Sequence, residues 1–404
     1  MTGGAIGATS TKLAPPVWLI FAVTITGILS NSLLTANIPD ILRELEQPDS
    51  RAGLLVAASP LPGVLMAPII GVLADRYGRR QILVPCLVLF GVAGGLSAVA
   101  VDFRLLLLAR FLQGVGGAGL INLSVVLIGD HWTGVERTRL IGRNSAVLTV
   151  CLAFIPSVGG VIGEFAGWRY SLALGMAALP LALVSWRRLP ANRPGTDRTI
   201  GTQLRGALLA VRQPVVLTVL LTGVILFTVI FGVFLTALPV HLEDEFGLSA
   251  GPRGIILSTF SIGATFAALN LGRMRRRFAT RTMLVGSCAV VAVSAAALGL
   301  APTVALIVVA SIVYGLGDGT AIPALQDLIA EAAPDEQRAS VMAAWVSGVR
   351  LGQTVGPIGA AALFTATSTQ TTMLVGAAVF ALLGVAMTMA PLTLSADRPG
   401  TAAA

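Results

Sequence analysis

Residues 71–80 read GVLADRYGRR and place one aspartate and three arginines within a short stretch. The segments on either side, 52–73 and 82–101, are long and apolar. About 20 consecutive apolar residues in a helix are enough to cross the hydrocarbon core of a bilayer. Because the charged stretch between the two segments is so short, it must lie at a membrane face. This part of the sequence therefore predicts two antiparallel membrane helices joined by a charged turn.

The rest of the chain has the composition of a polytopic membrane protein. Of its 404 residues, 55 % are hydrophobic and 11 % are charged, whereas a soluble domain carries roughly a quarter charged residues. Twelve segments are long and apolar enough to predict membrane helices. They are 16–39, 52–73, 82–101, 104–128, 141–163, 168–186, 214–240, 253–272, 282–300, 302–326, 339–364 and 370–392. The first has no A-x-A cleavage site, which favours a membrane helix over a removable signal peptide.

The distribution of charge predicts the orientation and argues against a nucleic-acid partner. The net charge is +8, but the basic residues lie in short loops between apolar segments. If the N-terminus is cytoplasmic, the cytoplasmic segments hold twenty basic residues and the opposite segments hold five. Such a bias follows the positive-inside rule. We therefore predict that both termini are cytoplasmic and that the partner of the surface is a lipid bilayer.

An internal repeat predicts two six-helix halves. At an offset of 201 positions, similar residues recur over six spans. The matched positions are 34–36 with 235–237, Gly53 with Gly254, Gly71 with Gly272, 114–116 with 315–317, and Pro156 with Pro357. The long connection 187–213 is interrupted by Pro190 and Pro194, as expected of a linker. The expected fold is thus an all-α membrane protein of 12 transmembrane helices, with pseudo-symmetric halves at 1–186 and 214–404 around a central site.

The sequence contains no pattern typical of an enzyme or of a metal site. Cys86, Cys151 and Cys288 lie inside apolar segments and form no C-x-x-C pair, so we expect packing roles without disulfides or metal. His131 and His241 are isolated at the ends of spans. We find no nucleotide-binding loop and no catalytic triad. We therefore predict neither an enzymatic activity nor a cofactor.

Three motifs resemble signatures of the major facilitator superfamily of transporters. The pattern G-x-L-A-D-R-x-G-R-R at 71–80 is similar to its loop-2/3 signature. Residues 110–118, RFLQGVGGA, resemble the family pattern R-x-x-Q-G-x-G-x-A in span four. Residues 155–160, IPSVGG, resemble the antiporter pattern G-P-x-x-G-G, except that Ile155 replaces its first glycine. The resemblance covers essentially the whole chain and is greatest to the twelve-span drug:proton antiporters, which implies alternating access of the two halves.

The resemblance implies a latch at the charged turn. In the family, the acid at the position of Asp75 is thought to face the N-terminal end of span eleven, where the helix dipole favours an anion. Gly71 and Gly78 are expected to allow a close approach and a tight turn. The other candidates for gating are Arg76, Arg79 and Asp130. The alternative is that these charges only fix the topology or lie in solvent.

Three ionisable residues inside the spans are candidates for proton coupling. Arg110 lies roughly 9 Å deep in span four, and the resemblance implies a role in coupling. The alternative is a structural charge satisfied by carbonyl oxygens or by Asp40 or Glu164. Asp318 in span ten and Arg350 in span eleven lie at matching depths, which predicts a buried ion pair. A carboxyl that gains and loses such a partner changes its pKa, as a proton carrier requires; a static pair, or residues that never meet, is the alternative.

By resemblance, spans one, four, seven and ten line the substrate cavity. The candidate lining residues are Asn31, Thr35, Asn37, Gln113, Asn122, Phe227, Phe231 and Tyr314. A mostly apolar lining suits an amphiphilic or hydrophobic small molecule, although packing against lipid is the alternative for the phenylalanines. We therefore expect a monomeric, proton-coupled multidrug-type exporter in the inner membrane of a bacterium. An exporter of one endogenous metabolite, such as a siderophore, and an importer are the alternatives.

Overall fold

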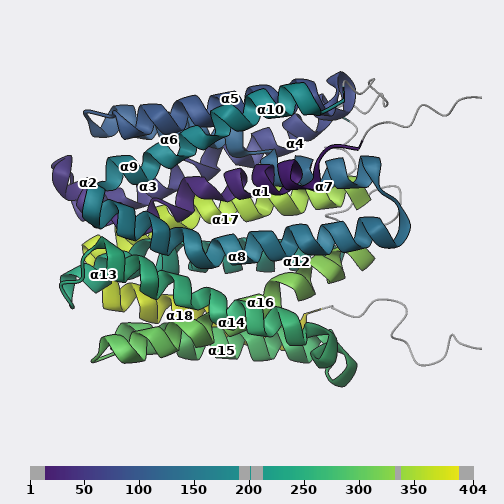
Figure 1. Ribbon diagram of the computed structural model, residues 1–404. Helices are drawn as coiled ribbons and strands as arrows, with labels where there is room; N and C mark the ends of the chain where they lie inside the picture. Colours follow the sequence, from purple (N-terminus) through teal and green to yellow (C-terminus); the bar gives the residue numbers. More distant parts are fainter. Residues whose placement is uncertain (1–13, 191–200, 202–212, 333–337, 391–404) are drawn as a thin grey trace, which may run out of the picture.

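The computed structural model describes residues 14–190, 201, 213–332 and 338–390 (Figure 1). Within these residues all regular structure is helical. The helices of the first half are α1 (Val17–Ser32), η1 (Thr35–Asn37), α2 (Ile38–Glu44), η2 (Asp49–Arg51), α3 (Ala52–Ala57), α4 (Pro60–Tyr77), α5 (Arg79–Ala98), α6 (Phe103–Gly117), α7 (Leu120–His131), α8 (Gly134–Ala166), α9 (Trp168–Ala173), η3 (Leu174–Ala177) and α10 (Ala178–Arg188). Those of the second half are α12 (Pro214–Val229), η4 (Ile230–Ala237), α13 (Leu238–Asp244), α14 (Ala250–Arg277), α15 (Thr280–Leu300), α16 (Val304–Ala332), α17 (Arg338–Ala366) and α18 (Thr369–Met389).

The helices correspond to the predicted membrane spans. In the described part of the chain, 11 helical segments are long and apolar enough to cross a membrane. The predicted span at 339–364 is not among the eleven, but it coincides with α17, a continuous helix of 29 residues. At 1.5 Å per residue, α17 is longer than the roughly 30 Å of a hydrocarbon core. An all-helical membrane fold, as the sequence predicted, is therefore confirmed.

Two of the spans change geometry part-way along their length. In the first span, α1 gives way to the short 3-10 helix η1 just before Pro39, whose ring nitrogen cannot donate a hydrogen bond. In the seventh span, η4 is π-helical, and Thr236 Oγ1 donates to the carbonyl oxygen of Phe231 at 2.7 Å. Single π-helical turns often occur at functional sites. Both irregular segments lie toward the same end of the bundle, next to α2 and α13.

Apolar packing is concentrated within each half, and a few helices form the contact between the halves. One large buried cluster consists almost entirely of residues from α12 to α18, and another comes from α1 to α10. A third cluster mixes both halves and includes Leu34, Ile38, Ala237 and Val240. Between the halves, α8 packs along α14, while α17 packs against α3 and α4. Figure 1 shows α5 and α10 at one edge of the bundle and α15 at the opposite edge.

The α8–α14 contact requires glycine. A Cβ atom added to Gly254 would lie 3.2 Å from Gly160 Cα and 3.1 Å from the carbonyl carbon of Pro156. Real Cβ atoms rarely approach backbone this closely, so a side chain at this position would separate the two helices. Pro156 and Gly160 belong to the partial antiporter motif, which therefore lies at the contact between the halves.

We name the two ends of the bundle after a residue at each end. The Asp75 end holds the ends of α4, α7 and α14, and the Asp40 end holds α2, α13 and the start of α14. The sequence predicts that the Asp75 end faces the cytoplasm. Of the predicted linker 187–213, residues 191–200 and 202–212 lie outside the described residues. The division into domains at this linker therefore stays a prediction.

Candidate functional site

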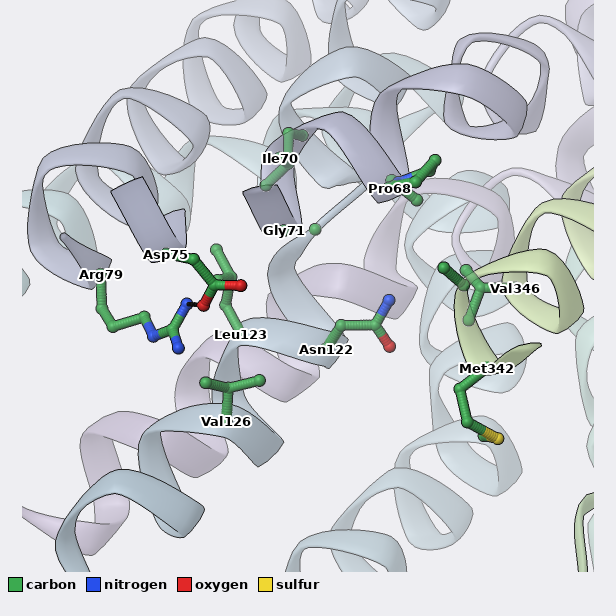
Figure 2. Close-up of a pocket in the computed structure, with 13 residues that line it drawn as sticks. Pro68, Ile70, Gly71, Asp75, Arg79, Asn122, Leu123, Val126, Met342 and Val346 are labelled. Atoms are coloured by element: carbon green, nitrogen blue, oxygen red, sulfur yellow. Dashed lines mark ion pairs between the residues drawn. The ribbon is translucent and has the colours of Figure 1, made fainter. Parts of the chain in front are cut away.

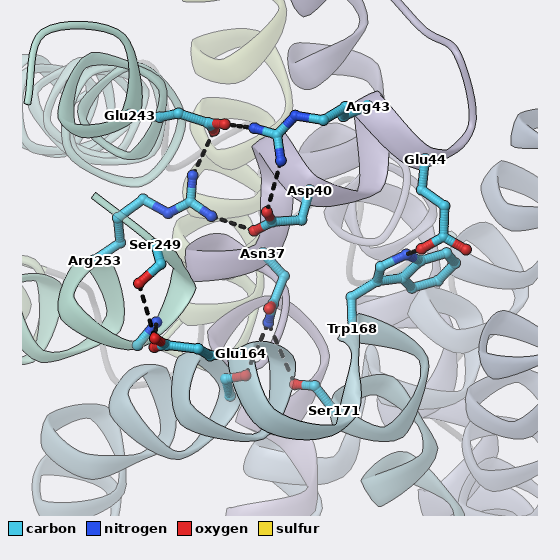
Figure 3. A network of polar contacts seen from close by, with 12 residues as sticks. Asn37, Asp40, Arg43, Glu44, Glu164, Trp168, Ser171, Glu243, Ser249 and Arg253 are labelled. Carbon is cyan, nitrogen blue, oxygen red and sulfur yellow. Dashed lines mark hydrogen bonds and ion pairs between the residues drawn. The ribbon is translucent and has the colours of Figure 1, made fainter. Parts of the chain in front are cut away.

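Four charged side chains meet at the Asp40 end and join the halves (Figure 3). Arg253, in the first turn of α14, is fully buried. Its guanidinium pairs with Asp40 of α2 and, at 2.5 Å, with Glu243 of α13. Arg43 pairs with the same two carboxylates, at 3.1 Å in the case of Asp40. The two arginines and two carboxylates balance in charge, which offsets part of the cost of burying Arg253.

A second contact between the halves lies beside this network. The Glu164 carboxylate on α8 accepts hydrogen bonds from Ser249 Oγ at 3.0 Å and from the Gly251 N–H at 2.9 Å. Ser249 precedes α14, and Gly251 lies in its first turn. The first N–H groups of a helix have no partner within the helix, and its dipole favours an anion at this end. Glu164 therefore acts as a cap for α14 that is supplied by the other half.

Arg110 is fully buried and is held by neutral oxygens. Its Nη1 donates to the Ser30 carbonyl oxygen at 2.7 Å, to Ser30 Oγ at 2.9 Å and to Gln113 Oε1 at 2.8 Å. Its Nη2 donates to Asn31 Oδ1. Among the described residues no acid pairs with Arg110, since Asp40 and Glu164 bind α14 instead. Of the two alternatives for a structural charge, the geometry matches satisfaction by neutral oxygens.

Asp318 lies on α16 with both carboxylate oxygens buried and without a hydrogen-bond partner in the described part of the chain. Tyr314 and Ser311 lie three or four residues apart on the same face of α16, and their hydroxyl groups are also buried without a described partner. Phe234 and Phe260 pack against the Tyr314 ring, at centroid distances of 5.3 and 6.0 Å. This face of α16 thus carries three polar groups in an otherwise apolar environment.

The predicted ion pair between Asp318 and Arg350 is not present. Arg350 on α17 is only half-buried, and its Nη1 donates to Gln353 Oε1 at 3.2 Å. The reason is helix packing: α16 packs chiefly against α14 and α15, whereas α17 packs against α12, η4, α3 and α4. Matching depths on consecutive spans did not make these two side chains neighbours.

At the Asp75 end, three of the predicted gating residues form one cluster. Arg79 pairs with Asp75 and, at 3.0 Å, with Asp130 at the end of α7. Gly78 has a φ of 102°, which favours glycine and makes the tight turn between α4 and α5. Arg76 lies apart from this cluster, with its guanidinium 5.5 Å from the Tyr77 ring centroid. Asp75 therefore contacts its own turn here, and α17 begins at Arg338, after residues that are not described.

A pocket of about 370 Å³ opens beside this cluster, between α4, α7 and α17 (Figure 2). It is lined by Ala67, Pro68, Ile70, Gly71, Asp75, Arg79, Gly119, Asn122, Leu123, Val126, Met342, Ala343 and Val346. The lining is mostly apolar, with Asn122 and the Asp75–Arg79 pair as its polar groups. A Cβ atom on Gly71 would meet no described atom within 4 Å. The close approach predicted at Gly71 is therefore absent, and Gly71 lines the pocket instead.

The other predicted cavity residues lie elsewhere. Asn37 is fully buried and donates to the carbonyl oxygens of Leu33 at 2.9 Å and Gly159 at 3.0 Å, which ties the first span to α8 (Figure 3). Thr35 is fully buried in η1. Phe227 and Phe231 contact each other at 6.5 Å between ring centroids. Asn122 is the one predicted cavity residue that lines the described pocket.

Sequence reasoning missed the network around Arg253. From the sequence, Asp40 was expected to be a possible partner of Arg110, and Arg253 was counted only among the five basic residues on the side opposite the cytoplasm. The sequence did contain a sign of this network. Asp40 and Arg43 follow the first span and Glu243 follows the seventh, so that opposite charges lie on the same predicted side of the membrane. Which of these loops contact each other could not be predicted from the sequence.

A family model described as Major Facilitator Superfamily matches residues 19–252 and 220–403. The chain belongs to this superfamily. It is therefore a multi-pass membrane transporter, as the motifs at 71–80 and 110–118 predicted, and its relatives support the predicted likeness to drug:proton antiporters.

Several relatives within the Major Facilitator Superfamily are exporters or resistance proteins by name. The chain is 25 % identical over 352 residues to a bacillibactin exporter of Bacillus subtilis (strain 168), covering 83 % of this chain and 86 % of that protein. It is 27 % identical over 365 residues to the class B tetracycline resistance protein of Escherichia coli, covering 86 % of this chain and 87 % of that protein. It is also 27 % identical over 157 residues to an MFS-type transporter of Aspergillus terreus (strain NIH 2624 / FGSC A1156), but this match spans 39 % of this chain and only 28 % of that protein.

Solved structures confirm the superfamily fold. The crystal structure of a bacterial homolog of the human lysosomal transporter Spinster, in an inward-facing and occupied conformation, superposes with a TM-score of 0.77. The sequences are 17 % identical, and the match covers 96 % of this chain and 98 % of that chain.

Proposed function

We propose that this transporter exports amphiphilic or hydrophobic small molecules from the cytoplasm in exchange for protons. The observation that carries the proposal is the contrast between the two ends of the bundle. At the Asp40 end, Arg253 and Glu164 join the halves, whereas a pocket separates α4 and α7 from α17 at the Asp75 end. The arginine bias predicts that the Asp75 end faces the cytoplasm. An exporter loads its substrate in a conformation of this kind.

The pocket lining supports an amphiphilic substrate. Most lining side chains are aliphatic, and Asn122 is the uncharged polar group among them. Sites of this composition bind the apolar body of a small molecule and use a few polar groups to orient it. The resistance and exporter names of the relatives support the direction of transport. The similarity to a bacillibactin exporter favours export of one endogenous metabolite, such as a siderophore, as the second candidate.

We assign the proton to Asp318. An unpaired carboxylate buried at this depth of a membrane costs several kcal/mol. Protonation of Asp318 removes this cost in the conformation described, and access to water in the alternate conformation would let the proton leave. Ser311 and Tyr314 lie on the same face of α16, and neither hydroxyl bonds the carboxyl group in the conformation described. We further propose that Arg110 anchors α6 to α1, so that the two spans move together.

The latch at the Asp75 end completes the cycle. When the pocket closes, Asp75 leaves Arg79 and caps the N-terminal end of α17, just as Glu164 caps α14 at the opposite end. The halves would then alternate between two capped contacts, one at each face of the membrane. We propose that a single chain in the bacterial inner membrane suffices, since the first half supplies both capping carboxylates, Asp75 and Glu164, and the second half supplies both capped helices.

Efflux from energised cells tests the proposal. Cells that produce the wild type or Asp318→Asn at matched levels are loaded with ethidium, Nile red or 1-pyrenebutyrate, which are cationic, neutral and anionic. We expect the wild type to export at least one probe, an uncoupler to stop it, and Asp318→Asn to abolish it. Glu331→Gln, at the exposed end of the same helix, is the control. If the wild type exports none of the probes, multidrug export is wrong and the metabolite exporter takes its place.

A further inference from the structure

Arg350 lies on the same face of α17 as residues that line the pocket. Ala343 and Val346 line the pocket, and Arg350 follows Val346 by one helical turn and Ala343 by two on the same face. The neighbouring helix shows the same relationship. Ala67 of α4 lines the pocket, and Gly63 lies one turn beyond it, on the same face of the helix.

The Arg350 side chain extends from α17, in the second half, to Gly63 of α4, in the first half. A Cβ atom added to Gly63 would lie 3.1 Å from Arg350 Cδ and 3.2 Å from its Nε. The absence of a side chain at Gly63 therefore makes the space in which the arginine lies. The side chain therefore lies at the junction of α4 and α17, one helical turn from the pocket-lining residues Ala67 and Val346.

The charge of Arg350 is not compensated in the described part of the protein. Its contact is with the neutral side chain of Gln353, and Asp318, the acid at matching depth, is not a partner. The two fully buried arginines of the described chain have more hydrogen-bond partners than Arg350 has. Arg110 is surrounded by oxygens of three residues, and Arg253 pairs with two carboxylates. Arg350 is therefore a half-buried guanidinium that has no acid partner among the described residues and lies one helical turn from a pocket.

We propose that Arg350 is the anion-binding group of the transport site. The substrates would then be amphiphiles with an apolar body and a single carboxylate, sulfonate or phosphate group. The planar guanidinium matches such oxyanions in geometry and binds them through charge-assisted hydrogen bonds. The apolar walls formed by α4, α7 and α17 receive the body, and Gln353 orients the arginine. This inference rests on the proposed export function and specifies the chemistry of its substrate.

Two probes with the same body and opposite charge test the site. The purified protein in a neutral detergent is heated with increasing 1-pyrenebutyrate or 1-pyrenebutyltrimethylammonium, and the rise in Tm gives the apparent affinity. We expect the carboxylate probe to bind the wild type more tightly than the ammonium probe. Arg350→Gln should weaken carboxylate binding by about tenfold or more, as expected for loss of a charged hydrogen-bond partner. The affinity of the Arg350→Gln variant for the ammonium probe should not fall.

Three further variants separate recognition from folding. Arg350→Lys keeps the charge and should recover part of the carboxylate binding. Gly63→Ala keeps the charge but displaces the flexible end of Arg350, so it should weaken carboxylate binding with little change in Tm without probe. Arg104→Gln removes an exposed arginine of α6 and should bind both probes as the wild type does.

Three outcomes would overturn the proposal. The first is that the wild type does not bind the carboxylate probe, or binds it no better than Arg350→Gln does. The second is that phosphatidylglycerol gives the same Arg350-dependent rise in Tm and displaces the probe, which would make a lipid headgroup the ligand. The third is failure of export itself, which the efflux assay reports separately. Normal efflux combined with Arg350-independent binding overturns the anion site alone.

Discussion

Arg253 at the start of α14 forms an ion pair with Asp40 of α2, and this pair joins the two halves at the Asp40 end. Arg253 is fully buried, while Asp40 remains one-third exposed. The pair is therefore accessible from one side only, and its separation would bring both charges into water. A contact with these properties suits a gate that opens and closes in each transport cycle.

Loss of Arg253 should open the Asp40 end. Arg253→Gln removes the buried charge of the network and leaves Arg43 as the shared partner of Asp40 and Glu243, so α14 loses its ion pairs to α2 and α13. We expect the equilibrium to shift toward a conformation in which α2 and α13 separate. Electron–electron double resonance between spin labels at Asp49→Cys and Glu245→Cys, in a background without native cysteines, measures this distance. Arg104→Gln removes the same charge and should leave the distance unchanged; an unchanged distance in Arg253→Gln as well would show that the network is not a gate.

Removal of the Glu164 cap should have a smaller effect in the same direction. Glu164→Gln keeps a hydrogen-bond acceptor for the Gly251 N–H but removes the charge that the dipole of α14 favours, which is worth about 0.3–1 kcal/mol. Glu164→Ala removes the acceptor as well and should open the Asp40 end further. The same pair of spin labels reports both variants. If Glu164→Ala and Glu164→Gln behave alike, the hydrogen bonds contribute nothing beyond the charge.

A methyl group between α8 and α14 should destabilise the protein. Gly254→Ala places a Cβ atom within 3.1–3.2 Å of backbone atoms of Pro156 and Gly160, so the helices must move apart. Gly272→Ala on the same helix meets no described atom within 4 Å and should stabilise by up to about 1 kcal/mol through helix propensity. Thermal unfolding in detergent compares the two variants. Equal Tm values would contradict the close packing at Gly254.

A side chain at Gly71 should hold the pocket open. In the present conformation Gly71 faces the pocket and has room for a larger residue. We therefore expect Gly71→Val to fold with a normal Tm but to lose transport, because the pocket cannot close around the added side chain. Gly272→Val, at the matching position of the repeat, serves as the control. Wild-type transport by Gly71→Val would show that α4 and α17 do not approach each other at this point.

The sequence predicted the parts of the fold that depend on local patterns. Apolar length located the spans, and the tight turn at Gly78 followed from the charged stretch around it. It did not predict the environment of Arg350, because depth in the membrane says nothing about which helices are neighbours. It also treated Arg253 as a loop charge, since only tertiary structure brings α14 to α2 and α13. The predicted roles of the cavity residues depend on the same tertiary information and stay predictions.

The most direct test of proton-coupled export uses purified protein in liposomes under an imposed pH gradient. The probe is the compound that the wild type exports from cells, and its movement is followed against the gradient. We predict that the wild type accumulates the probe only when protons flow in the opposite direction, that Asp318→Asn does not accumulate it, and that Glu331→Gln behaves as the wild type does. Proton-coupled export through Asp318 would be contradicted if Asp318→Asn transported the probe at the wild-type rate, or if transport by the wild type did not depend on the pH gradient.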